Sequence, residues 1–343
     1  MKETPTVTSV GGAEIPALLS VSPSPHIHHP DTTRTVMLDV IFALIPAALW
    51  GVYIFGLRVL WVILVSVVSA VLAEAITQKL LRRPVTVADC SAALTGLLLA
   101  LNLPATVPLW MCAIGSAFAI IVVKQLFGGI GKNFVNPALA ARVFLFAWPE
   151  SMSFFTAPGA RLGLFDFSVK ADGVDVVSTA TPLASLKTGI IPEVSIFDLA
   201  FGEVGGCIGE VSAILLIAGG IYLLVRRVIT WHIPVAYLGT VALVTFLFPQ
   251  GGAGATFMLM ELFSGGLMLG AFFMATDYTT SPITPAGRLI FGVGCGLLTV
   301  LIRYFGGYNE GVSFAILIMN TLVWYLDRFT RPKVFGGGKN GRK

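Results

Sequence analysis

The strongest constraint on this chain is the run of apolar segments that recurs along its length. A helix needs ~20 apolar residues to cross the hydrocarbon core of a bilayer, and segments near that length follow one another from residue 36 onward. Only 12% of the residues are charged, about half the share in soluble domains. We therefore expect an all-α polytopic membrane protein of about ten transmembrane helices.

Hydropathy marks the candidate spans and two of them are short. The candidates are 36–55, 58–80, 91–103, 107–126, 137–148, 206–225, 231–248, 256–275, 286–304 and 311–327. Segments 91–103 and 137–148 are too short for a full crossing. Two interpretations of these segments are equally favoured. They are short helices that line a central site, as in transporters, or they are ordinary helices with an early boundary. In the second case Asn102 and Pro104 end the first helix early, and Pro137 starts the second.

These spans predict five regions in chain order. They are an N-terminal arm (1–35), a first half of five helices (36–148), an outer loop (149–205), a second half of five helices (206–327) and a basic tail (328–343). The arm lacks the apolar stretch of a signal peptide. Five helices on each side of an outer loop predict two inverted repeats, although the halves share no convincing sequence identity.

Lysine and arginine in short loops and at helix ends predict the orientation, because they concentrate on the cytoplasmic side. With the N-terminus inside, the inner set is Lys79, Arg82, Arg83, Lys124, Lys132, Arg142, Arg226, Arg227, Arg288, Arg328, Arg331, Lys333, Lys339, Arg342 and Lys343. The outer set is only Arg58 and Arg303. Both termini are therefore expected in the cytoplasm, with the loop 149–205 outside a plasma or inner membrane.

Metal-binding and nucleic-acid-binding patterns are weak. The four cysteines (Cys90, Cys112, Cys207 and Cys295) form no CxxC pair, so we expect small apolar packing residues and no metal site on this chain. A cluster shared with a partner subunit would need only some of these thiolates.

His26, His28 and His29 lie in a Pro-rich arm that is more typical of a solvated segment than of a metal site. The net charge of +4 reflects residues that flank spans, so no nucleic-acid partner is expected.

The outer loop contains a hydroxyl-rich turn, Ser178-Thr179-Ala180-Thr181-Pro182, three residues after Asp175. Threonine often caps a helix whose first residue is proline. From local physics alone, Thr181 would therefore be an N-cap and nothing more.

Four stretches in order along the chain carry a resemblance to a known family. They are the outer-loop turn with Asp175; Ser24-Pro25-His26 with Met37-Leu38-Asp39; Gly128 to Arg142; and Met274 to Arg288 with Tyr308 to Asn320. Together they resemble the family that contains the D subunit of the Rnf complex and the B subunit of the sodium-pumping NADH:quinone reductase. The set spans nearly the whole chain. Thr179 departs from the pattern, since glycine is more usual there.

The resemblance implies a covalent flavin. In this family's flavinylation motif the acceptor threonine follows an aspartate, a hydroxyl residue, a small residue and alanine. The matching positions are Asp175, Ser178, Thr179, Ala180 and, as the acceptor, Thr181. The resemblance therefore implies FMN joined to Thr181 by a phosphoester that a separate flavin transferase makes. Thr181 would be an anchor with no catalytic role, and the isoalloxazine would carry the electrons.

Polar residues at the expected inner face form a second candidate site. Asn133, Asn136, Arg142, Asp277, Thr280, Ser281 and Arg288 belong to two irregular loops and the helices after them. Polar groups at membrane depth are functional candidates, which here means a second, non-covalent flavin such as riboflavin, or the lining of an ion route. The equal alternative is that these side chains only satisfy loop backbone.

Glu261 is the best single candidate for ion coupling. It lies about a third of the way into the span 256–275, where a carboxylate must be paired, protonated or hydrated. The alternative, which we weigh more heavily, is a neutral acid hydrogen-bonded to a neighbouring helix.

The implied function is that of an electron-transfer subunit of an ion-translocating ferredoxin:NAD oxidoreductase complex, with the A, B, C, E and G subunits of that complex as partners and Na⁺ or H⁺ as the ion. Ferredoxin and NAD are expected on partner subunits, because this chain has no dinucleotide-binding fingerprint. The short N-terminal arm favours this member of the family over the quinone-reductase subunit. A channel or transporter without a redox role is the third alternative.

Overall fold

The computed structural model describes residues 31–157, 159, 161–164, 181–189, 191–192, 194–202, 204–210, 212–250 and 254–332. Thr33 and the described residues that follow it belong to one compact unit. Its described part is helical, with β contacts limited to two isolated bridges, Gly56 with Leu162 and Pro104 with Cys207. The predicted all-α architecture is confirmed for these residues.

The unit's described residues include ten longer helices and several short helical elements. The longer helices are α1 (Thr33–Phe55), α2 (Arg58–Leu80), α3 (Ser91–Leu101), α4 (Leu109–Phe118), α5 (Pro137–Leu145), α9 (Ala213–Val225), α10 (His232–Leu247), α11 (Gly254–Phe263), α13 (Pro285–Phe305) and α14 (Val312–Thr330). The short elements are η1 (Val87–Asp89), the π-helical η2 (Ala119–Gln125) and η3 (Gly270–Met274), α6 (Pro149–Met152), α7 (Pro182–Lys187), α8 (Ile196–Phe201) and α12 (Leu267–Leu269).

Among the described residues, four helices are long and apolar enough to cross a membrane: α1, α2, α13 and α14. A fifth crossing results if α11 and α12–η3, which bend by 66° at their junction, are one span. Helices α3, α9, α10 and the joined α4–η2 are apolar but shorter. This pattern is that of a polytopic membrane protein, and the count of about ten crossings stays a prediction.

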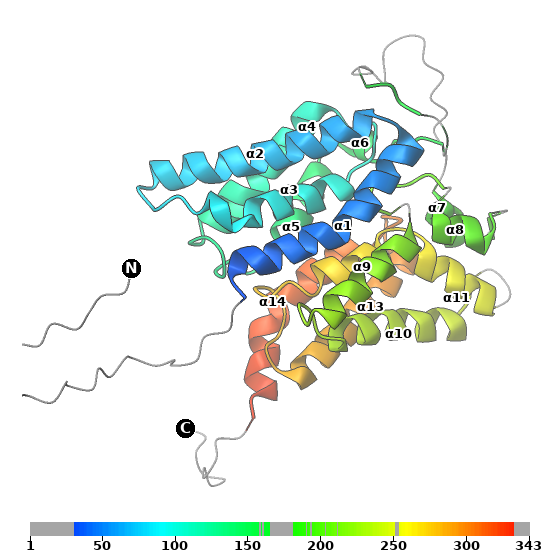
Figure 1. Cartoon of the computed structure of the whole chain (residues 1–343). Helices are drawn as coiled ribbons and strands as arrows, with labels where there is room; N and C mark the ends of the chain where they lie inside the picture. The colour runs from blue at the N-terminus through cyan, green and yellow to red at the C-terminus, as the bar shows by residue number, and fades with distance from the viewer. Residues whose placement is uncertain are drawn as a thin grey trace, which may run out of the picture. The chain divides into compact units, whose positions relative to one another are not determined.

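The helices pack in two groups (Figure 1). In the first, α2 packs against α3 and α4; in the second, α10 packs against α11 and α13. The groups meet where α1 packs against α9 and α5 against α14. Glycine permits one of these contacts, because a Cβ on Gly219 of α9 would lie 2.5 Å from the carbonyl oxygen of Ala43 in α1.

Helix α3 ends early because another segment takes over its hydrogen bonds. The amides of Ile208 and Gly209 donate to the carbonyls of Leu103 (3.0 Å) and Leu101 (2.7 Å), so the chain beyond α3 runs beside residues 207–209. A Cβ on Gly209 would lie 2.6 Å from that of Leu101, and only glycine allows this approach. The same pairing explains why the predicted span 206–225 is wrong at its start: the helix begins at Ala213.

The break between α11 and α12 is held by a buried arginine. Arg303 of α13 donates to the carbonyls of Glu261 (2.7 Å) and Ser264 (3.0 Å), which end α11. It also pairs with the Glu261 carboxylate at 2.6 Å, and both side chains are 2% exposed. Glu261, the candidate for ion coupling, is therefore an ion-pair partner that also helps to fix the bend.

Candidate functional site

Thr181 precedes α7 in the position of an N-cap, with Pro182 at the first helical position, as local physics predicts. Its backbone is extended (φ −66°, ψ 146°), but its side chain makes no capping hydrogen bond. A threonine cap normally accepts from an amide of the first turn. The Thr181 hydroxyl is thus not used to cap α7.

Contacts at both ends hold α7 in place. Lys187, in its last turn, donates to the carbonyls of Gly306 (2.5 Å) and Tyr308 (3.2 Å) in the loop between α13 and α14. Leu183 and Leu186 are buried on its inner face. Contacts with the second half of the chain therefore fix the position of α7 and of Thr181, although both belong to the outer loop.

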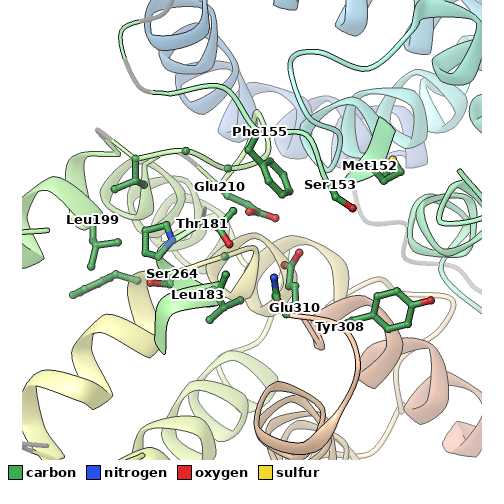
Figure 2. Close-up of a pocket in the computed structure, with 18 of the residues that line it drawn as sticks. Met152, Ser153, Phe155, Thr181, Leu183, Leu199, Glu210, Ser264, Tyr308 and Glu310 are labelled. Carbon is green, nitrogen blue, oxygen red and sulfur yellow. The ribbon is translucent and has the colours of Figure 1, made fainter. Parts of the chain in front are cut away.

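Thr181 lies in the wall of a cavity of about 430 Å³, within the range of small-molecule sites. Figure 2 shows Thr181, Glu210, Glu310 and Phe155 around this space. The lining comes from the α5–α6 region, α7, α8, the segment before α9, the α11–α12 bend and the loop before α14: Arg142, Phe146, Met152, Ser153, Phe155, Thr181, Pro182, Leu183, Ala184, Leu199, Val204, Gly205, Gly206, Glu210, Phe263, Ser264, Gly265, Gly307, Tyr308, Asn309 and Glu310.

One wall of the cavity is aromatic. Phe146 lies 5.3 Å from Tyr308 between ring centroids, and Phe314 stacks on both from behind, at 5.8 Å and 5.0 Å. Two buried polar atoms of the lining, Ser264 Oγ and Arg142 Nε, find no hydrogen-bond partner within the described part of the chain. Buried polar atoms normally have partners, so the cavity suits a ligand with a flat ring and polar atoms.

The charged part of the cavity is centred on Arg142, which is 4% exposed. Its Nη1 donates to Asn102 Oδ1 (2.8 Å), and its Nη2 contacts Glu310 Oε2 and, at 3.3 Å, Glu210 Oε1. The two carboxylates lie in the non-helical segments before α14 and α9.

The surroundings affect these two acids in opposite directions. Burial, together with the charge of Glu310, raises the pKa of Glu210 to about 7, although Arg142 opposes this. Burial also acts to raise the pKa of Glu310, but Arg142 and Arg303 outweigh it and hold that pKa below its usual range. Glu310 is therefore the better-stabilised anion of the pair.

The two irregular loops that the sequence places at the inner face do meet in the structure. Asn133 Nδ2 donates to Thr279 Oγ1 (2.9 Å), and Asn136 Nδ2 donates to the carbonyl of Met274 (3.2 Å). Asn136 also caps α5, since its Oδ1 accepts from the amides of Ala138 (3.0 Å) and Leu139 (3.3 Å). With its amide turned to satisfy its neighbours, Asn320 donates to the carbonyl of Thr280 and accepts from the amide of Asn136.

The other predicted site residues divide among three places. Asp277 is held inside its own loop, where it accepts from Thr279 and Thr280, and its carbonyl accepts from the amide of Ser281. Arg288 lies at the start of α13 and donates to the carbonyl of Pro282 and to Thr230. Arg142, predicted to belong with these loops, instead contacts the carboxylates of the Thr181 cavity.

Four residues of the predicted flavinylation motif, Asp175, Ser178, Thr179 and Ala180, lie outside the described residues. The cavity also contains residues that sequence reasoning did not select, among them Phe146, Phe155 and Ser264. A single apolar or small residue in a helix or loop does not indicate a binding site from sequence alone. Tyr308 and Glu310 could be selected, because both belong to a stretch that supports the family resemblance.

Comparisons with known proteins agree over most of the chain. Residues 20–336 match the model of the NQR2, RnfD, RnfE family. The chain is 48% identical over 324 residues to the D subunit of the Na(+)-translocating ferredoxin:NAD(+) oxidoreductase complex of Acetobacterium woodii, with 93% of this chain and 95% of the relative covered. It is 41% identical to the D subunit of the proton-translocating ferredoxin:NAD(+) oxidoreductase complex of Clostridium ljungdahlii (93% and 96% covered). It is 38% identical to the D subunit of the ion-translocating oxidoreductase complex of Escherichia coli O127:H6 (93% and 99% covered).

Proposed function

Since the chain belongs to the NQR2, RnfD, RnfE family, we propose that it is the membrane electron-transfer subunit of an ion-translocating ferredoxin:NAD oxidoreductase complex and carries FMN on Thr181. The relatives described above are all named as D subunits of ion-translocating oxidoreductase complexes. The A, B, C, E and G subunits of that complex would be its partners, and a flavin transferase would attach the FMN.

The observation that carries the proposal is the combination at Thr181. Its hydroxyl makes no cap bond, and it lies in the wall of a cavity that has an aromatic side and unpartnered polar atoms among the described residues. A helix cap alone needs the hydroxyl bond and needs no cavity. A tether for a ring-shaped cofactor needs the free hydroxyl and the cavity together.

The residues present fit FMN. The Thr181 oxygen would hold the phosphate as a phosphoester, the wall of Phe146 and Tyr308 would pack against the ring, and Ser264 and Arg142 would meet its polar edge. The flavin would supply one-electron and two-electron transfer. This chain's residues would bind it, orient it and set the charge around it, and a covalent tether would keep it from being lost outside the cell.

The junction of the two inner loops remains a candidate for a second, non-covalent flavin such as riboflavin or for part of an ion route, with Glu261 as a further candidate for the route. Asn133, Asn136, Thr280 and Asn320 already bond to one another or to loop residues. This favours the alternative in which they only satisfy the loops.

The proposed topology has ten crossings in two inverted five-helix halves, with both termini in the cytoplasm and residue 181 outside. It is supported by the similar packing of α2 on α3 and α4 and of α10 on α11 and α13. It is also supported by the Lys and Arg excess in inner loops. That excess persists without Lys124, Arg142, Arg58 and Arg303, which are buried and bond within the protein.

A cysteine introduced between residues 160 and 175 is expected to react with a membrane-impermeant thiol reagent added from outside intact cells, because the Lys and Arg distribution puts this loop there. A cysteine in the loop between α2 and η1, for example at Val85, is exposed and should react only after lysis. The reverse pattern would invert the topology.

The experiment that tests the proposed cofactor is in-gel fluorescence. The chain, co-expressed with its flavin transferase, is denatured and run on a gel that removes free flavin. Yellow-green fluorescence at the band of this chain is the expected result, because only a covalent bond survives denaturation. A dark band would contradict the proposal.

The quinone-reductase B subunit and a channel without a redox role are the rival functions. A quinone that copurifies with the chain, or sensitivity to quinone-site inhibitors, would favour the first rival. A dark gel band with ion flux through the purified chain would favour the second.

A further inference from the structure

Two carboxylates share one guanidinium in the wall of the Thr181 cavity. Arg142 Nη2 contacts Glu310 Oε2 and lies 3.3 Å from Glu210 Oε1. Glu310 has a second strong donor, since its Oε1 accepts from the amide of Gly266 at 2.7 Å. Glu210 has the long bond to Arg142 and one at 3.4 Å from the amide of Cys207. Glu210 is therefore the acid whose negative charge is less well stabilised.

The charges around this cluster do not balance. Glu210 faces Arg142 of α5, Glu310 of the loop before α14 and the Cys207 thiol of its own segment. The next cation, Arg303 of α13, is already paired with Glu261. Two ionised carboxylates and one guanidinium leave a net charge of −1. Burial disfavours such a net charge, and a proton on one acid removes it.

The cavity beside this cluster has the features of a ligand site independently of the acids. Ser264, 2% exposed, and Arg142 each present a buried polar atom without a partner among the described residues. A ligand that contacts them would lie within the same cavity as Glu210 and Glu310. Any charge that this ligand gains would act on the cluster at short range, because the ligand and the two acids would lie in the same cavity.

We infer that Glu210 is a proton-binding site coupled to the redox state of the group in this cavity, taking up a proton when the group gains an electron and releasing it when the electron leaves. This inference rests on the proposed function. The electron comes from the neighbouring redox carrier of the complex. The proton comes from water at the outer side of the cavity and forms an O–H bond on the Glu210 carboxylate. The ion pair between Glu210 and Arg142 becomes a hydrogen bond from the guanidinium to a neutral acid. The added proton balances the added electron, so the net charge of the cavity stays constant.

Two properties suit Glu210 to this role. Burial and the charge of Glu310 raise its pKa, so a further negative charge nearby favours its protonated form. Glu310, held ionised by Arg142 and Gly266, keeps the guanidinium in place whichever state Glu210 adopts. The cluster can therefore change by one proton without losing its geometry.

Infrared difference spectroscopy tests the inference in two measurements. In the first, flavin-free Thr181→Ala protein is titrated with acid and base. We expect the C=O band of a protonated carboxylic acid to disappear with a midpoint near pH 7, and to be absent in the Thr181→Ala, Glu210→Gln protein. In the second, wild-type protein with covalent flavin is reduced about one pH unit above that midpoint, and a C=O band should appear that Glu210→Gln removes.

The midpoint potential gives a second readout. One proton per electron contributes about 59 mV for each tenfold change in proton concentration. We expect Glu210→Gln to lose part of the wild-type pH slope, and Glu150→Gln, an exposed acid on α6 outside the cavity lining, to keep the full slope. Glu310→Gln should also lose part of the pH slope. It leaves Glu210 as the single acid paired with Arg142, so the net charge of −1 that favours protonation of Glu210 is removed.

The outcomes separate this inference from the function on which it rests. Covalent flavin without the reduction-linked band, or a band that persists in Glu210→Gln, overturns the inference and leaves the tether intact. A band that only Glu310→Gln removes also overturns it, since the proton then belongs to Glu310. A dark gel band together with a titrating Glu210 overturns both the tether and the coupling.

Discussion

Thr181→Ala is expected to abolish the flavin fluorescence of the denatured chain completely. The alanine lacks the oxygen to which the phosphate would be bound, and Pro182 beside it offers no other acceptor. The fold should survive, because the Thr181 side chain makes no capping hydrogen bond that α7 would lose. The measurement is the in-gel fluorescence per amount of protein, with the variant co-expressed with the transferase.

Neighbouring hydroxyl residues provide the matched controls for this variant. Thr179→Ala removes the second threonine of the motif and should keep the fluorescence, since the acceptor register falls on Thr181. Thr188→Ala, at the other end of α7, loses only a bond to the carbonyl of Ser185 and should behave like the wild type. Fluorescence that follows Thr179 and not Thr181 would shift the acceptor, and fluorescence in both alanine variants would refute a threonine tether.

Arg303→Met is expected to lower the free energy of unfolding by about 3–5 kcal/mol. The substitution leaves the Glu261 carboxylate buried without its cation. It also removes the donors for the carbonyls of Glu261 and Ser264 at the bend between α11 and α12. Thermal unfolding of the purified chain in detergent measures the loss as a lower midpoint temperature.

A double variant and a surface variant control for this effect. Arg303→Met with Glu261→Leu removes both charges and should recover much of the loss, because an apolar pair can replace a buried ion pair at little cost. Arg328→Met removes an exposed arginine that lies over the Trp324 ring and should change stability by only about 0.5 kcal/mol. A single variant as stable as the wild type would contradict the structural importance of the pair.

The same double variant examines the role of Glu261 in ion coupling. If Glu261 serves only to fix the bend, the reconstituted complex with both substitutions should still move ions when electrons flow. If Glu261 is part of the ion route, the double variant should fold, transfer electrons and fail to move ions. Redox-driven ion uptake into vesicles distinguishes the two outcomes.

The segments that become helices could be predicted from the sequence because their cause is local. The long apolar runs have no partner for their backbone amides in a bilayer except within a helix, and α1, α2, α13 and α14 lie where hydropathy places them. The start of α5 was equally predictable, since Asn136 and Pro137 are a cap and a first helical residue. The loss of residues 206–212 from the predicted span was not predictable, because residues 101–103 bind amides of that segment.

The candidate site also has features that local sequence predicts and features that only the tertiary structure determines. Local sequence was enough to show that Thr181 precedes a short helix, and the family resemblance implied that this threonine is a flavin anchor. Three features emerged only from the folded chain: the Thr181 hydroxyl makes no cap bond, Phe146 and Tyr308 form a wall of the same cavity, and Glu210 and Glu310 share Arg142. These residues lie far apart along the chain, and ion pairs and cavities arise from packing between helices, which a local pattern of residues does not specify.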